Sequence, residues 1–167
     1  MKDELSPVEK HGPLWFKRED LAGGQKGRCL RFMVDEYLAT SPGPHGLLSA
    51  SPGTSPQSSF SAREARRNHI PLICVVGVNS MEAALEYAPL KVADALGAEI
   101  ILAGASQNSW RRDRKYKALC EAYPTYFQVP EGLGPCKDDP EWLERFYMNS
   151  AYQTSNLPKL DTLIMPC

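Results

Sequence analysis

The sequence predicts an α/β fold with a mainly parallel, twisted sheet flanked by helices. From about residue 46 onward, apolar runs typical of strands alternate with helical patterns, and this alternation is typical of strands joined by crossover helices. Residues 71–78 form a continuous apolar run of the kind that is buried on both faces of a parallel sheet. Of the 167 residues, 43% are hydrophobic, as in ordinary globular chains.

The first 45 residues combine a short strand with an amphipathic helix. Residues 14–17 are an apolar, strand-like run, and the glycine pair at 23–24 separates them from a helix predicted to begin at Gln25 or Lys26. Apolar residues then recur at spacings of three and four, which marks one buried helix face. The residues of this face are Leu30, Met33, Val34, Tyr37 and Leu38.

Residues 41–59 are rich in Ser, Pro and Gly and have two interpretations. The stretch is either a flexible linker or a short strand at 46–50, followed by a loop that opens a polar helix at 57–68. Proline and glycine interrupt helices and strands in both cases, so composition alone leaves the two interpretations open.

The remaining elements follow from caps and breakers. Ser80 is a candidate N-cap of a helix that runs toward Leu96, Pro89 is expected to kink or divide that helix, and Gly97 ends it. Strands are predicted at 99–104, 126–129 and 160–166, and helices at 109–123 and 139–152. We expect an N-terminal strand and helix at 1–45, a small α/β domain at 46–130, and an incomplete return toward a large domain at 131–167.

Charge and cysteine usage exclude several classes of protein. The formal net charge is −1, so no strong field attracts nucleic acid or an anionic membrane. No apolar run is long enough to cross a bilayer and no signal peptide is evident. The five cysteines form no C-x-x-C pair, which favours reduced thiols in a cytoplasmic protein.

Metal and phosphate sites are not evident either. His11, His45 and His69 are far apart and lack ligand-spaced partners, so no metal site is predicted. The basic stretch at 110–115 contains Asp113 within a predicted helix and is interpreted as a solvated face.

Lys26 is the main candidate for chemistry. It follows two glycines, which allow a planar ligand to approach the backbone closely. The positive end of the helix dipole disfavours a protonated amine, and a neutral amine is what Schiff-base formation with an aldehyde requires. Position alone favours a solvated lysine in the first helical turn over a cofactor-bearing one.

Lys26 also lies within a characteristic pattern of two stretches. These are Lys17-Arg18-Glu19-Asp20-Leu21 and Gly23-Gly24-Gln25-Lys26-Gly27-Arg28-Cys29-Leu30. The pattern resembles the cofactor-lysine segment of fold-type-II (tryptophan-synthase-like) enzymes that depend on pyridoxal 5'-phosphate (PLP). The most similar branch is that of aminocyclopropane-carboxylate deaminase and D-cysteine desulfhydrase, although Gln25 replaces the usual Asn. The resemblance implies that PLP is the cofactor and that Lys26 carries it as a Schiff base.

A second segment, residues 51–58, resembles the loop with which this family holds the substrate carboxylate. By that match, Ser55 is the catalytic hydroxyl beside the cofactor, and Thr54 and Gln57 contact the carboxylate or the ring oxygen of the cofactor. Pro56 stands where the family often has Asn, and proline has no N–H to donate. A loop that opens a helix can also bind an anion through its amides.

The resemblance covers nearly the whole chain but only the N-terminal half of the expected enzyme. Residues 160–166 resemble the strand before the family's glycine-rich phosphate loop, so we expect that loop to lie beyond Cys167 and the fold to be truncated before it. The implied function is a PLP-dependent lyase, deaminase or β-replacement enzyme of amino acid metabolism, acting on a small amino-acid-like substrate. The alternatives are a catalytically inactive fragment and an interaction module of that fold, as a homodimer or with a separately encoded second half.

Overall fold

The computed structural model describes residues 7–18, 24–104 and 109–133, together with Glu141 and Glu144. The chain divides into two compact units. One comprises Met1–Gly24 and Pro135–Cys167, and the other comprises Gln25–Gly134. The predicted helix at 139–152 and the predicted strand at 160–166 lie outside the described residues, apart from Glu141 and Glu144, which are helical.

The described part of the first unit is an antiparallel hairpin of β1 (Val8–His11) and β2 (Leu14–Lys17). Two residues join the strands, and Gly12 takes a φ of +60°, as the first residue of a tight hairpin turn requires. Across the hairpin, the Arg18 guanidinium donates to the Glu9 carboxylate at 2.7 Å. The sequence predicted β2 but not β1, whose alternating charges hide its partnership with β2.

The second unit is built on a four-stranded parallel sheet in the order β5-β4-β3-β6. The strands are β3 (Leu47–Ser51), β4 (Leu72–Val76), β5 (Glu99–Leu102) and β6 (Phe127–Gln128). Every residue of β4 is buried, as its continuous apolar run predicted. The predicted α/β fold with a mainly parallel sheet is therefore confirmed.

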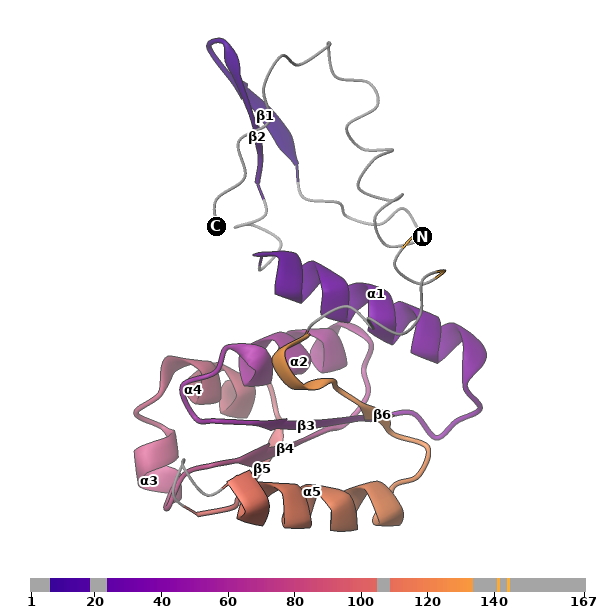
Figure 1. Ribbon diagram of the computed structural model, residues 1–167, viewed down its shortest axis with the longest axis vertical. Coiled ribbons are helices and arrows are strands. Elements are labelled where there is room, and N and C mark those ends of the chain that lie inside the picture. The colour runs from indigo at the N-terminus through magenta and orange to yellow at the C-terminus, as the bar shows by residue number, and fades with distance from the viewer. Residues whose placement is uncertain (1–6, 19–23, 105–108, 134–140, 142–143, 145–167) are drawn as a thin grey trace. The chain divides into compact units, whose positions relative to one another are not determined.

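Helices cover both faces of this sheet (Figure 1). They are α1 (Gly24–Thr40), α2 (Gln57–Arg67), α3 (Met81–Ala84), α4 (Ala88–Ala95) and α5 (Ser109–Ala122). In Figure 1, α1, α2 and α4 lie on one side of the sheet and α5 lies on the other. Coverage of both faces is what a parallel sheet with buried strands requires.

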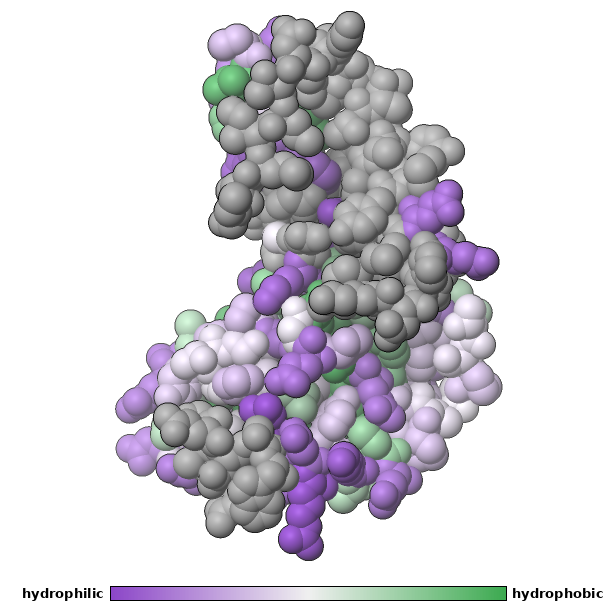
Figure 2. Space-filling model, viewed as in Figure 1, coloured by the Kyte–Doolittle hydropathy of each residue, from purple (hydrophilic) through white to green (hydrophobic). Residues whose placement is uncertain are grey.

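The core lies between the sheet and the helices α1, α2 and α4. It joins the predicted apolar face of α1 to buried side chains of the sheet, of α2 and of α4, among them Leu30, Val34, Leu47, Val76 and Leu90. Four members of the predicted face of α1 are buried, and Leu38 packs against the core. In the view of Figure 2, most of the visible described surface of this unit is hydrophilic or neutral, with scattered hydrophobic residues.

Tyr37 ties the end of α1 to the start of two strands. Its hydroxyl donates to the Thr125 carbonyl at 2.6 Å and accepts from the Gly46 amide at 3.3 Å. Its ring lies 5.4 Å from that of Phe127. Gly46 is required here, because a Cβ at this position would lie 2.4 Å from the Tyr126 ring.

The stretch at 41–59 contains β3, so the interpretation as a flexible linker is wrong and the one with a strand is confirmed. The N-cap at Ser80 is also confirmed, because its hydroxyl accepts from the Ala83 amide at 3.1 Å. Pro89 lies in the first turn of α4 and separates α4 from α3, so the predicted helix is divided rather than kinked.

Helices α2 and α4 end in the same motif with different residues. The Ile70 amide donates to the Ala65 carbonyl and the Ala98 amide donates to the Ala93 carbonyl, both at 3.0 Å. The residue just before each donor has a positive φ, which is 55° for His69 after α2 and +86° for Gly97 after α4. Glycine is the usual residue at this position because a Cβ is strained there.

We therefore expect His69→Gly to increase the free energy of unfolding by about 1 kcal/mol, because the strain of the left-handed conformation is removed. The matched change Gly97→Ala is expected to lower it by a similar amount, since a Cβ at Gly97 meets no atom within 4 Å and only backbone strain is added. Urea unfolding of both variants measures the effect, and a destabilised His69→Gly variant would contradict it.

Cys29, Cys74 and Cys120 are free thiols, as predicted; Cys136 and Cys167 lie outside the described residues. Burial raises the pKa of Cys29 to about 11 and that of Cys74 to about 12. The folded state therefore retains these protons above the ordinary pKa of 9.0, and the stability they contribute is lost as the pH rises from 9.0 toward those values.

We therefore expect the melting temperature, measured by circular dichroism, to fall above about pH 9.

We also expect a thiol reagent at pH 8 to modify the half-buried Cys120 at least roughly tenfold faster than Cys29 or Cys74. Peptide mapping after timed labelling measures the rates, and equal rates at the three thiols would contradict the buried placement.

In the described part of the chain, no helix is long and apolar enough to cross a membrane.

Candidate active site

The carboxyl ends of the parallel strands mark the most favourable place for a site in the second unit. The chain runs from β3 to β4 and β5 on one side, and then returns to place β6 on the other side of β3. This reversal is a topological switch point, and ligands of open α/β sheets bind outside the carboxyl ends of the strands at such a point. The elements that follow β3 and β6 therefore define the candidate site.

The loop after β3, residues 52–56, leads directly into α2. Ser55 is half-buried and Thr54 is exposed. The Ser55 backbone amide donates to the Pro52 carbonyl at 3.0 Å, and the Ser55 hydroxyl accepts from the backbone amide of Gln57 at 3.3 Å. Gly53 is buried and closely approached, because a Cβ there would lie 2.7 Å from Val78. The loop is therefore an ordered, tightly packed helix entry.

The entry of α2 has an electrostatic character that suits an anion. The backbone amide of Gln57 is bonded to the Ser55 hydroxyl, but the N-cap residue Pro56 provides no side-chain cap and no acidic residue lies in the first turn. The first amides of any helix lack acceptors within the helix, and the helix dipole adds positive potential there. Two basic residues, Arg66 and Arg67, lie in the last turn, where the dipole has the opposite sign.

Both polar atoms of the Gln57 side chain are hydrogen-bonded at the switch point. The side-chain nitrogen Nε2 donates to the Ser49 hydroxyl at 3.2 Å and to the Ala50 carbonyl at 3.4 Å. Its oxygen accepts from the Gly132 amide at 3.1 Å. Only 3% of the residue is exposed. Its side chain thus joins β3 to the turn after β6, and a ligand contact would have to replace one of these bonds.

Lys26 lies in the first turn of α1, and its side chain is exposed. Its position relative to the Ser55 loop follows from ion pairs between α1 and α2. Arg31 donates to Glu64 at 3.2 Å, and one turn further along both helices Arg67 pairs with Asp35. The two helices therefore run in the same direction, with their first turns at the same end.

The level of Lys26 can be set from these pairs. Lys26 precedes Arg31 by five residues, about 7.5 Å along a helix axis, and Ser59 precedes Glu64 by the same number. Lys26 is therefore level with the first turn of α2. The structure places Lys26, Thr54, Ser55 and Gln57 at the same end of the α1–α2 pair, beside the carboxyl ends of the strands.

The turn after β6 closes the switch point from the other side. It is the 3-10 segment η1 (Glu131–Leu133), in which Gly132 has a φ of 76° and Leu133 a φ of 52°. Leu133 is buried in the core. A non-glycine residue in this conformation is strained, and it persists when the surroundings fix it. The Gln57 bond to Gly132 and the burial of Leu133 are the fixing contacts.

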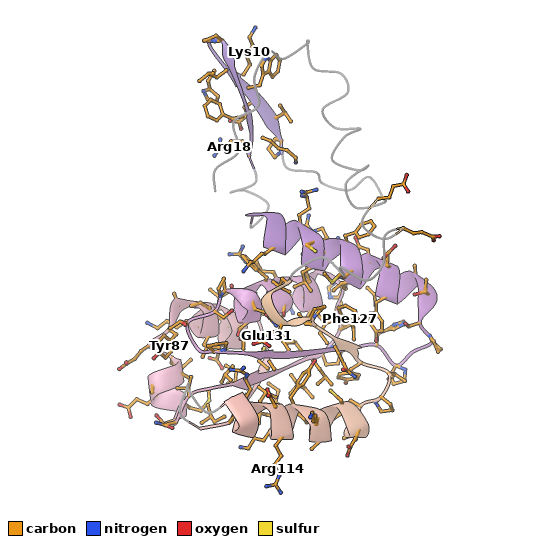
Figure 3. The ribbon with its side chains drawn as sticks, in the orientation of Figure 1. Lys10, Arg18, Tyr87, Arg114, Phe127 and Glu131 are labelled. Carbon is orange, nitrogen blue, oxygen red and sulfur yellow. The ribbon has the colours of Figure 1, made fainter. Side chains whose placement is uncertain are left out.

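Arg112 of α5 is a residue of this edge that sequence reasoning missed. The basic stretch at 110–115 was interpreted as a solvated face, but only 8% of the Arg112 side chain is exposed. The interpretation as a solvated face is correct for Arg114, which is exposed and points away from the sheet in Figure 3. The spacing of Arg112 with Tyr116, Leu119 and Cys120 was the available signal, because it is that of a buried helix face.

Comparisons with known proteins show the fold. No protein-family model and no curated protein sequence matches the chain. Among solved structures, the chain is similar to the crystal structure of a pyridoxal 5'-phosphate-dependent aspartate racemase, with a TM-score of 0.58 and 16% identity. The match covers 92% of this chain and 47% of that one, so the chain spans about half the length of the solved structure it matches. The fold is thus similar to that of a PLP-dependent enzyme.

Proposed function

We propose that the chain is part of a PLP-dependent enzyme that acts on an amino acid or an amino-acid-like group, with Lys26 as the residue that holds the cofactor. The observation that carries this proposal is the parallel arrangement of α1 and α2, which brings Lys26 level with the Ser55 loop at the carboxyl edge of the sheet. Fold similarity to a PLP-dependent racemase supports the cofactor class.

The residues at this edge are proposed to serve the cofactor and its substrate. PLP, when bound, supplies an aldehyde for covalent attachment and a ring that withdraws electrons from the substrate. The exposed Lys26 amine is accessible for that attachment and, when not attached, would be a base for the proton on the substrate α-carbon.

The substrate carboxylate is proposed to bind at the entry of α2. The amides that follow Gln57 in that entry and the exposed Thr54 hydroxyl would be its donors, and no acidic side chain competes in the first turn. Ser55 is proposed to lie beside the cofactor, with its hydroxyl proton available for donation because the oxygen already accepts from the Gln57 amide. Gln57 would act mainly by holding the turn at Gly132.

The type of reaction is proposed from the resemblance of the Lys26 and Ser55 segments to deaminases and desulfhydrases. Deamination, elimination and β-replacement all begin by breaking a bond at the substrate α-carbon, and the orientation of that bond against the cofactor ring selects it. The arrangement at Lys26 and Ser55 is compatible with each of these.

The test is the visible absorption of the purified chain with and without added PLP. We expect a saturable band from the attached cofactor in the wild type, and no band in Lys26→Ala. Lys91→Ala is the matched control, because Lys91 is an exposed helix lysine of α4 and should leave the band unchanged.

Two results would contradict the proposal. If Lys26→Ala gives the same band as the wild type, Lys26 does not hold the cofactor. If the wild type gives no band at any PLP concentration, the residues of this chain do not hold the cofactor, and the non-catalytic alternative, a fragment or interaction module of this fold, is favoured.

A further inference from the structure

Arg112 is a buried cation whose partners among the described residues do not satisfy all its donors. Only 8% of its side chain is exposed, and it lies in the first turn of the 14-residue helix α5. Among the described residues its side chain makes a single hydrogen bond, from Nη2 to the Glu131 carboxylate at 3.4 Å. Asp113 approaches Nε only to 3.9 Å. A guanidinium has five N–H donors, and desolvated charges normally satisfy them.

The partner carboxylate is held loosely. The Glu131 side chain is 79% exposed, although the guanidinium it meets is buried. Charge-assisted bonds between guanidinium and carboxylate are usually shorter, about 2.7–2.9 Å. The Glu131 carboxylate therefore lies on an anion-binding group without filling it, and water reaches it from the open side.

The backbone beneath Glu131 is fixed independently of Arg112. The Gly132 amide is bonded to Gln57 at 3.1 Å, and Leu133 is buried in the core. Because the Glu131 side chain is 79% exposed, its rotation alone would free Nη2 of Arg112 from the carboxylate without moving the turn. Glu131 is labelled in Figure 3.

We propose that Arg112 is the receptor of a binding site for a small carboxylate, and that Glu131 occupies this site as a tethered, exchangeable competitor. The site lies at the carboxyl edge of the sheet, where ligands of such folds bind. Carboxylate is the ligand class because a carboxylate already occupies the guanidinium, and the planar fork of arginine matches two oxygens of one group. The site does not depend on Lys26 or on any cofactor.

Competition by Glu131 leads to an unusual expectation for Glu131→Gln. A tethered competitor lowers the apparent affinity for a free ligand by a factor set by its effective concentration. Removal of its charge should therefore tighten acetate binding, by roughly three- to tenfold. Arg112→Lys should weaken it by about tenfold or more, because lysine lacks the bidentate fork.

The experiment is an acetate titration of the full chain without PLP, at fixed ionic strength with chloride as the replaced anion. The readout is the Nε–Hε resonance of Arg112, assigned by its loss in Arg112→Lys. We expect saturation with a Kd on the order of 1–10 mM in the wild type. Glu121→Gln is the matched control, because Glu121 is an exposed residue of the same helix and its change alters the net charge equally.

The proposal is overturned if neither wild type nor Glu131→Gln shows saturable binding, or if Glu131→Gln tightens binding no more than Glu121→Gln does. Saturation by phosphate but not by acetate would overturn the carboxylate class. If Arg112→Lys does not fold, the Arg112 resonance is assigned through its bonded side-chain and backbone nuclei, and the comparison of the two glutamate variants decides the outcome. Because no cofactor is present, failure here leaves the Lys26 proposal intact, and failure of that proposal leaves this one intact.

Discussion

Leu30→Ala is expected to lower the free energy of unfolding by about 3 kcal/mol, because it removes a fully buried side chain and leaves a cavity in the core. Leu30 packs from α1, the helix that carries Lys26, against the core of the sheet layer. Such a loss is a large part of the stability of a small domain. Chemical unfolding followed by circular dichroism measures it.

The control for this change is Leu14→Ala in the hairpin. The Leu14 side chain is 52% exposed, and substitutions at exposed positions usually change stability by less than about 0.5 kcal/mol. A loss below about 1 kcal/mol for Leu30→Ala would mean that α1 does not pack on the sheet as described. Lys26 would then have no fixed position relative to the Ser55 loop.

Glu64→Ala is expected to cost about 2–3 kcal/mol of stability, because it removes the carboxylate shared by two arginines. Arg31 donates to Glu64 at 3.2 Å from α1, and Arg67 donates at 2.8 Å from α2. The Glu64 side chain is nearly buried, but about a quarter to a third of each arginine is exposed, which places the cost below that of a fully buried pair. Urea unfolding at low and high salt measures it.

Glu86→Ala is the matched control for Glu64→Ala, because Glu86 is an exposed glutamate of the same unit. The difference between the two variants isolates the contacts of Glu64 from a general change in charge. Equal stability of both variants would show that the pairs are surface contacts of little value. The inferred parallel arrangement of α1 and α2 would then lose its support.

Strand and helix positions could be predicted from the sequence where burial of one or both faces of an element sets the spacing of its apolar residues. The apolar run of β4 and the three- and four-residue spacing in α1 were sufficient, because each pattern reflects which side of an element meets the core. Ser80 and Gly97 also marked helix ends correctly, since caps depend on the backbone of a few neighbouring residues.

The hairpin strand β1 could not be found in the same way. Val8, Glu9, Lys10 and His11 give no apolar alternation, and the strand is defined by its pairing with β2. The remaining signal was Gly12 followed by Pro13, a two-residue connection whose first residue takes a positive φ.

The candidate site shows the limit of sequence reasoning more clearly. Lys26 and Ser55 were predicted as site residues from their segments, and the structure places both at the same end of α1 and α2, while their roles stay predictions. The side-chain bond of Gln57 joins residues 75 positions apart, and the contact between Arg112 and Glu131 spans 19 positions. Contacts at such separations depend on the order of the strands, which no local pattern in the chain specifies.

The most direct test of the cofactor residue is borohydride reduction of the PLP-treated chain, followed by peptide mapping of the modified lysine. Our account predicts one dominant modification, on Lys26, which is lost in Lys26→Ala without transfer to another lysine. A modification spread over surface lysines such as Lys10 and Lys91, with Lys26 no more reactive than they are, would contradict it.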